Sequence, residues 1–336
     1  MRIHKFQTTE AFVAIDLVGA DASSGPVRWA KKVLQGGAKD LARSQTYTYA
    51  ALGMQRGGAS AGISAGPEER SVAIDAFLAE VGTLVANRTY LPDAAKGVGA
   101  EELAPLTTDD PRDQARLGSF AERCDGLSAA VTAETLVGLE GRTVAIEGFG
   151  VNGSSIVAAV VERGATVTAV STAAGTVSNP AGLDPAALAS LGTDGLEALG
   201  EVTAPDAVFD VGADVVFAGS KTGIVDHTVA ARIGAATALV SSGRLAMTAR
   251  GLAVLRSAGV VAPADFVSLA GSTIAAWGEP SRTDDEILTA VAESTAALGA
   301  EHRGHADGAF LAACHMAEAF LSTWQDELPF GRPLAP

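Results

Sequence analysis

The stretch Arg142-Thr-Val-Ala-Ile-Glu-Gly-Phe-Gly-Val-Asn-Gly-Ser154 predicts a buried strand that leads through a glycine-rich turn into a helix. Its strand residues, 144–146, are all apolar, as a strand covered on both faces requires. The glycines Gly148, Gly150 and Gly153 follow in the spacing G-x-G-x-x-G. A helical segment at 152–163 and a second apolar strand at 166–170 complete the βαβ unit that gives this spacing its meaning.

This turn predicts a dinucleotide-binding site. The first glycine allows the tight turn, the second lets the backbone approach a pyrophosphate, and the third lets helix and strand pack closely. The free N–H groups and the positive end of the helix attract phosphates. A tight connection without any ligand is the alternative. The residues expected to contact the nucleotide are Gly148, Phe149, Gly150, Val151, Asn152, Gly153, Ser171, Thr172, Ala218 and Gly219.

The end of the second strand bears on the choice between NAD and NADP. An acidic residue that holds the ribose hydroxyls of NAD is expected there, but this chain has Ser171 and Thr172. No carboxylate at this position repels a 2′-phosphate, so both NAD and NADP are permitted. Arg163 is a possible partner for a 2′-phosphate, although a solvated arginine at the end of a helix is the alternative role.

Composition and charge narrow the class of protein. A length of 336 residues with 48% apolar and 5% aromatic residues predicts two domains with cores of small aliphatic side chains. The formal charge of −15 argues against binding nucleic acid or an anionic membrane, because both need a basic surface. The N-terminus lacks a signal-peptide pattern, and Cys124 and Cys314 lie far apart. We therefore expect a cytoplasmic protein without nucleic-acid or membrane partners.

The order of elements predicts an α/β fold. From residue 142 onward, short apolar segments at 143–146, 166–170, 215–218, 237–240 and 260–261 alternate with helical segments, which predicts a mainly parallel sheet covered on both faces. Helical segments at 283–298 and 304–324 close the chain.

The N-terminal half is expected to contain strands at 12–18 and 59–64, with a largely helix-compatible stretch at 27–52 between them. Residues 68–86 predict an amphipathic helix. Its apolar positions are Val72, Ile74, Phe77, Leu78, Val81 and Leu84.

Together these stretches resemble the glutamate/leucine/phenylalanine/valine dehydrogenase family over nearly the whole chain. The stretches that carry the resemblance are 14–16, 41–47, 57–63, 142–154, 164–171, 179–184, 213–220 and 259–265, with Tyr90, Gly97 and Gly99. The resemblance implies an N-terminal α/β domain for substrate binding and oligomerisation, residues 1–125, and a C-terminal Rossmann-type NAD(P)-binding domain, residues 126–302. A last helix at about 303–330 is expected to return to the first domain. The resemblance also implies that the chain forms a homo-oligomer.

The family's proton-handling residues are missing at the matching positions. Family members keep two lysines and one aspartate where this chain has Thr48, Ser60 and Ala95. Since general acid–base catalysis typically contributes about 10² to 10⁴ in rate, oxidation of a standard amino acid is expected to be severely weakened. The family's asparagines near the nicotinamide are replaced by Arg244 and Leu269.

Other ionisable residues remain near these positions. Arg28 matches a position where glutamate-type members bind the substrate carboxylate, and an arginine clamps a carboxylate well. With it, Thr48 and Ser60 are the expected substrate-binding residues. Asp93 and Lys96 flank Ala95 and are the candidate catalytic residues; a turn aspartate and a surface lysine are the alternative. The stretch Gly36-Gly-Ala-Lys39 imitates a family motif in the wrong register, so Lys39 is expected to lie on a helix surface.

The histidines indicate no metal site. His302 and His305 are spaced to share a helix face and Cys314 and His315 follow, but this matches no standard ligand pattern.

Three hypotheses for function remain open at this point. The chain is a divergent NAD(P)-dependent oxidoreductase for an amine, imine or carbonyl substrate other than a standard amino acid, or a catalytically silent nucleotide-binding or partner subunit. The third possibility is a non-redox enzyme.

Overall fold

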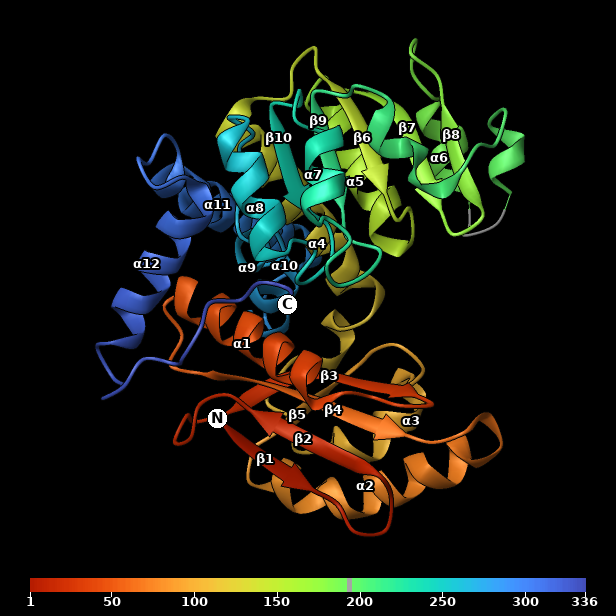
Figure 1. Ribbon diagram of the computed structural model, residues 1–336. Coiled ribbons are helices and arrows are strands. Elements are labelled where there is room, and N and C mark those ends of the chain that lie inside the picture. Colours follow the sequence, from red (N-terminus) through yellow and green to blue (C-terminus); the bar gives the residue numbers. More distant parts are fainter. Residues whose placement is uncertain (192–194) are drawn as a thin grey trace. The chain divides into compact units, whose positions relative to one another are not determined.

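A computed structural model describes residues 1–191 and 195–336 of the chain. The chain divides into two compact units (Figure 1). The first contains residues 1–118 and 316–333, and the second contains residues 119–315 and 334–336. None of the helices within these described stretches is long and apolar enough to cross a membrane.

The first unit is built on a five-stranded sheet in the order β1-β2-β4-β3-β5. Its strands are β1 (Arg2–Lys5), β2 (Ala11–Ile15), β3 (Ser23–Ala30), β4 (Gly57–Ser64) and β5 (Leu91–Ala94). The sheet is mixed: β2 is antiparallel to β1 and to β4, whereas β3 is parallel to β4 and to β5.

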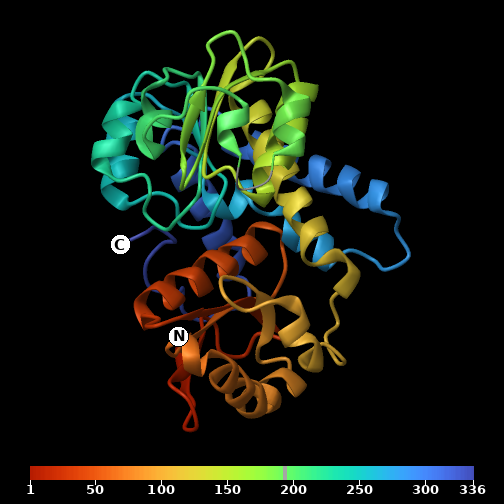
Figure 2. The same cartoon turned by 90° about the vertical axis from the view of Figure 1, so that its right-hand side faces the viewer.

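Helices cover both faces of this sheet, with α1 (Gln35–Ala51) on one side and α2 (Arg70–Ala86) on the other (Figure 2). Phe77 and Val81 of α2 pack with Val27 and Ala61 in one core, while Ala38 of α1 packs with Phe12 and Ala14 on the opposite face. The remaining helix of this region is α3 (Ala100–Leu103).

Two expectations for this half are wrong in detail. Residues 27–30 belong to strand β3 rather than to a helical stretch, and Pro26 hides the strand because proline normally argues against a central strand. The ladder with β4 is interrupted at Gly25 and Pro26. Val72, expected on the apolar face of its helix, is 72% exposed, whereas its neighbour Ala73 is buried.

The second unit contains a five-stranded sheet in the order β10-β9-β6-β7-β8. Its strands are β6 (Thr143–Glu147), β7 (Thr166–Thr172), β8 (Gly175–Ser178), β9 (Val215–Ala218) and β10 (Ala238–Ser241). All neighbours are parallel except β7 and β8. The predicted α/β class with a mainly parallel sheet is therefore confirmed.

Helices α4 (Ser119–Val137) and α5 (Val151–Glu162) pack on one face of this sheet in a shared core that includes Ala129, Val160 and Ile146. The other helices of the second unit are α6 (Pro185–Ser190), α7 (His227–Arg232), α8 (Ala249–Ser257), α9 (Asp265–Ser268), α10 (Gly271–Ala276) and α11 (Asp284–His302). Helix α12 (Ala309–Leu321) begins in the second unit and ends in the first, which includes residues 316–333.

Three details differ from the sequence expectations in the second unit. The antiparallel strand β8 is not predicted, because it is short and follows β7 through a tight turn. The apolar pair Val260 and Val261 forms only an isolated bridge, between Val261 and Ala238. His302 ends α11, so His305 lies beyond the helix and does not share its face.

Candidate functional site

The glycine-rich turn joins β6 to α5 in the way that phosphate binding requires. Gly148 has a φ of +74°, and an added Cβ there would lie 2.7 Å from the Cβ of Ser220, so only glycine fits. An added Cβ at Gly153 would lie 2.7 Å from the ring of Phe149. At Gly150 the nearest atom to an added Cβ would be the Gly148 carbonyl oxygen, 3.8 Å away. The space above Gly150 is therefore open to a ligand.

A cavity of about 240 Å³ opens on this turn. It lies at the carboxyl ends of the parallel strands, where the strand order reverses between β6 and β9, and ligands of open α/β sheets bind at such reversals. The turn and the first residues of α5 meet the loops that follow β9 and β10 there. Its lining residues are Ile146, Gly148, Gly150, Asn152, Gly153, Ile156, Gly219 and Ser242.

The end of β7 carries hydroxyl groups and no carboxylate. Ser171 is buried, and its carbonyl oxygen accepts a hydrogen bond from the Phe149 N–H at 2.6 Å. The Thr172 hydroxyl accepts from the Ala174 N–H at 3.1 Å. Arg163 lies at the opposite end of α5 from the turn and donates to the Ala159 carbonyl at 2.7 Å. It therefore caps its own helix and is not placed to meet a 2′-phosphate.

A buried carboxylate that the sequence analysis missed, Glu147, fixes the loop after β9 on one side of the cavity. Glu147 ends β6, and its Oε2 accepts hydrogen bonds from the N–H groups of Gly219 at 3.0 Å and Ser220 at 3.1 Å. These bonds fix the loop after Ala218, the last residue of β9. The signal in the sequence is a glutamate directly before the first glycine of the turn, a position that a strand buried on both faces would normally fill with an apolar residue.

In the first unit, the hydroxyl groups at two of the positions expected to match the family's missing lysines bond to backbone carbonyls. Thr48 and Ser60 are fully buried. The Thr48 hydroxyl donates to the Ser44 carbonyl at 3.1 Å, and the Ser60 hydroxyl donates to the Pro26 carbonyl at 3.3 Å. The third position, Ala95, lies in a tight turn in which it bridges to Val98.

Arg28 is a desolvated cation in β3. It is half-buried, and its Nε is buried with no hydrogen-bond partner within residues 1–191 and 195–336. Burial lowers the pKa of its guanidinium, and the nearby Tyr90 opposes that shift. A buried N–H without a partner is costly, so Arg28 is suited to an anionic ligand such as a carboxylate.

Asp93 shares a face of the sheet with Arg28. Asp93 lies opposite Pro26 in the pairing of β5 with β3, and Arg28 follows Pro26 by two residues. Because side chains alternate along a strand, the two charged groups are placed on one face. Ser60 shares that face, since it precedes Gly62, the partner of Arg28 in β4, by two residues.

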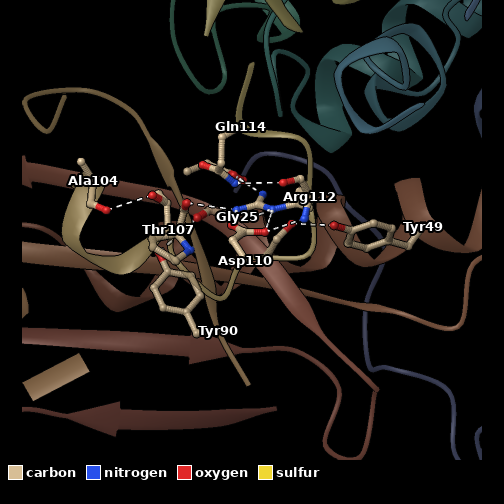
Figure 3. Close-up of polar contacts among 11 residues, drawn as sticks. Gly25, Tyr49, Tyr90, Ala104, Thr107, Asp110, Arg112 and Gln114 are labelled. Atoms are coloured by element: carbon tan, nitrogen blue, oxygen red, sulfur yellow. Dashed lines mark hydrogen bonds and ion pairs between the residues drawn. The ribbon is translucent and has the colours of Figure 1, made fainter. Parts of the chain in front are cut away.

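A second residue that the sequence analysis missed, Arg112, pairs with the carboxylate of Asp93. Figure 3 shows Arg112 beside Asp110. The Arg112 side chain is 2% exposed, and its Nη2 lies 2.7 Å from Oδ2 of Asp110 and donates to the Pro92 carbonyl at 3.2 Å. Although burial alone would lower the pKa of Arg112, the charges of Asp93 and Asp110 raise it above its usual value. The polar residues around Asp110-Pro-Arg112 could be recognised in the sequence. Their contact with Asp93 could not, because it forms only in the folded chain.

The other predicted residues are more exposed. Lys96 lies at the tip of the turn formed by residues 95–98 and is exposed. Lys39 lies exposed on α1. The Nδ1 atoms of His305 and His315 lie 3.9 Å and 4.0 Å from Oδ2 of Asp307. No group of three or more histidine, cysteine, aspartate or glutamate residues in the described stretches is arranged to hold a metal ion.

Sequence comparison agrees with this geometry. Residues 126–289 match the family described as Glutamate/Leucine/Phenylalanine/Valine dehydrogenase. No curated protein sequence matches the chain. The resemblance seen in the sequence is thus confirmed for residues 126–289, which match this family.

Solved structures share the fold of both units. The chain is similar to a hetero-hexameric glutamate dehydrogenase from Thermus thermophilus, with 22% identity over 93% of this chain and 84% of that one and a TM-score of 0.72. A Plasmodium falciparum glutamate dehydrogenase is 15% identical over 93% and 79% of the two chains, with a TM-score of 0.73. The L-tryptophan dehydrogenase from Nostoc punctiforme is 16% identical over 96% and 97%, with a TM-score of 0.67.

Proposed function

We propose that this chain is a divergent NAD(P)-dependent oxidoreductase that acts on an amine, imine or carbonyl compound other than a standard amino acid. The observation that carries this proposal is the open space above Gly150, at the mouth of the cavity between the turn and the loops after β9 and β10. A dinucleotide bound there supplies hydride chemistry, which belongs to the cofactor itself.

The residues that would hold the dinucleotide follow from the geometry. The turn from Gly148 to Gly153 and the N-terminus of α5 would bind the pyrophosphate, since backbone N–H groups and the positive helix end favour phosphates. Ser171 and Thr172 would meet the ribose. The loops after Ala218 and Ser241 would face the other half of the nucleotide.

The first unit supports binding of a polar substrate. Arg28 presents a desolvated cation and Asp93 a carboxylate on one face of the sheet. We propose that Arg28 binds an anionic group of the substrate, near the Ser60 and Thr48 positions. Asp93, fixed by Arg112, lies near the reacting nitrogen or oxygen. Lys96 remains the second candidate for proton transfer.

Reduction fits this set of residues better than oxidation of a protonated amine. An amine must lose a proton before hydride can leave its carbon, and a desolvated lysine or a free carboxylate usually accepts it. Thr48, Ser60 and Ala95 offer neither group. An imine or a carbonyl carbon accepts hydride directly, and the remaining proton can come from a weaker donor.

Turnover with a substrate panel tests this proposal. The purified chain is mixed with NADH or NADPH and a series of cyclic imines and carbonyl compounds, and separately with NAD or NADP and standard amino acids. We expect consumption of reduced nucleotide with at least one imine or carbonyl substrate. Turnover of amino acids at the rate usual for dehydrogenases would contradict the proposal.

A catalytically silent subunit is the second candidate function. The observation that favours it is that the hydroxyls of Thr48 and Ser60 both donate to backbone carbonyls and Ala95 carries no polar group. Nucleotide binding without turnover of any substrate in the same panel would favour this candidate.

We also propose that the chain forms a homo-oligomer and works in the cytoplasm. The similar glutamate dehydrogenase of Thermus thermophilus is hetero-hexameric, which supports an oligomer. Sedimentation of the purified chain measures its subunit number.

A further inference from the structure

The loop after β10 carries Arg244, which lies two residues beyond Ser242 in the sequence. Ser242 lines the cavity, and its carbonyl accepts a hydrogen bond from the Asn152 side chain of α5 at 3.4 Å. An added Cβ at Gly243 would lie 2.1 Å from the Gly219 carbonyl oxygen, so the loops after β9 and β10 touch backbone to backbone. Arg244 follows immediately and is half-buried.

The residue after Arg244 has a strained backbone. Leu245 adopts a φ of +56°, a left-handed conformation that residues other than glycine rarely take. The buried carboxylate of Asp265 holds it there, because its Oδ2 accepts the Leu245 N–H at 2.7 Å. Strain of this kind persists where the surrounding structure over-determines it, often at functional sites. The backbone is thus fixed on both sides of Arg244.

The topology places this loop at the nicotinamide half of the proposed nucleotide. Within the sheet, strands β7 and β8 lie on one edge of β6, and strands β9 and β10 lie on its other edge. The ribose that a carboxylate would select lies at the end of β7, so the opposite half of a dinucleotide extends towards the ends of β9 and β10.

A carboxylate lies near Arg244 within the same unit. Asp125 of α4 accepts a hydrogen bond from the Ser272 N–H at 2.7 Å. Burial raises the pKa of Asp125 to about 6, while Arg244 and the Ser272 N–H oppose the shift and Glu122, one turn earlier in α4, adds to it. Asp125 therefore compensates the charge of Arg244 when it is ionised.

We propose that Arg244 is a specificity residue that makes this site prefer the reduced nucleotide over the oxidised one, with Asp125 as a positioning residue that moderates the effect. The oxidised nicotinamide ring carries a positive charge and the reduced ring carries none, so a guanidinium near the ring disfavours the oxidised form relative to the reduced one. The inference rests on the proposed function, and it implies that the reduced nucleotide occupies the site when both forms are present at equal concentration.

Calorimetric titration of the full chain with NADH, NAD, NADPH and NADP tests this inference. For whichever pair binds, the ratio of the two dissociation constants is compared between the wild type and three variants. Arg244→Gln is expected to lower the preference for the reduced form on the order of tenfold, a Coulomb-scale effect. Arg244→Lys is expected to keep most of it, and Asp125→Asn is expected to increase it. Arg256→Gln, an exposed arginine on α8, removes the same charge and is the control.

The outcomes separate the inference from the function on which it rests. A ratio that is unchanged in Arg244→Gln, with both forms still bound, would overturn the role of Arg244 and leave the nucleotide site intact. A wild type that binds neither form would overturn the proposed function and this inference with it. A drop in affinity for both forms alike would show that Arg244 is only structural.

Discussion

The guanidinium of Arg112 is a deeply buried charge in the first unit. Its guanidinium bonds to Asp93, Asp110 and the Pro92 carbonyl, and only 2% of its side chain is exposed. A buried charge of this kind is tolerated only while all its partners remain, since each carboxylate left behind would be uncompensated. The ion pair therefore links β5 to the polar segment around Asp110.

We expect Arg112→Met to destabilise the protein by about 3 to 5 kcal/mol, because it leaves the Asp110 carboxylate buried without its cation. Urea denaturation measures the loss. Arg163→Met is the control, since Arg163 pairs at 3.6 Å with the exposed Glu162 and such surface pairs contribute about 0 to 1 kcal/mol. Equal losses in the two variants would contradict the structural role given to Arg112.

The carboxyl group of Asp125 is expected to make the stability of the protein depend on pH. Burial raises its pKa to about 6 in the folded chain, above the usual value of 3.8. The folded state then binds more protons than the unfolded state between these values, so the contribution of Asp125 to stability falls as pH rises from about 4 to 6. The difference in unfolding free energy between the wild type and Asp125→Asn should shrink or reverse over this range, followed by urea denaturation. A difference independent of pH would contradict the burial of this carboxyl group.

At the scale of elements, the strand and turn proposed to bind a nucleotide were predictable, and strand β3, which carries Arg28, was not. Strand β9 occupies the predicted residues Val215–Ala218 because a short apolar run between helices leaves little choice. Strand β3 was missed because Pro26 interrupts it, although its neighbours β4 and β5 supply pairing on both sides. Local sequence cannot reveal such compensation by tertiary contacts.

The side-chain network shows the same limit. The glycine spacing at 148–153 could be recognised because it is a local sequence pattern, although the atoms that exclude a side chain at Gly148 belong to the distant Ser220. The contacts of Arg112 with Asp93 and of Glu147 with Gly219 join residues 19 and 72 positions apart. Pattern analysis within a window of one helix or strand does not detect pairs at such separations.

The end of β7 offers a test of nucleotide choice. Thr172→Asp places a carboxylate where the ribose of the nucleotide is expected. It should weaken NADPH binding at least about tenfold through repulsion of the 2′-phosphate, while NADH binding is kept or improved. Fluorescence titration with both nucleotides measures the change, and Thr172→Asn is the uncharged control. Equal weakening of NADH and NADPH by Thr172→Asp would place the ribose elsewhere.

At the scale of the whole molecule, the residues proposed to bind the nucleotide and those proposed to bind the substrate belong to different units. The chain passes between the units after residues 118, 315 and 333. The proposed nucleotide contacts, from Gly148 to Ser242, all lie in the second unit, whereas Arg28, Asp93 and Arg112 lie in the first.

We therefore expect hydrogen exchange of the full chain to show nucleotide-dependent protection in the second unit. Saturating NADH or NADPH should slow exchange at residues 148–153, at the end of β7 and in the loops after β9 and β10, because bound phosphates and stacked rings shield these amides. Strands β1 to β5 are the internal reference. Protection that appears first in the sheet of the first unit would contradict the placement of the nucleotide.

The central claim is that the glycine-rich turn of this chain binds a dinucleotide. Calorimetric titration of the wild type and of Gly150→Leu with NADH and NADPH tests it most directly, because a leucine would fill the open space above residue 150. The account predicts saturable binding of at least one nucleotide to the wild type and a loss of at least about 100-fold, or 2.7 kcal/mol, in the variant. Equal affinity of the two proteins, or no binding to the wild type, would contradict it.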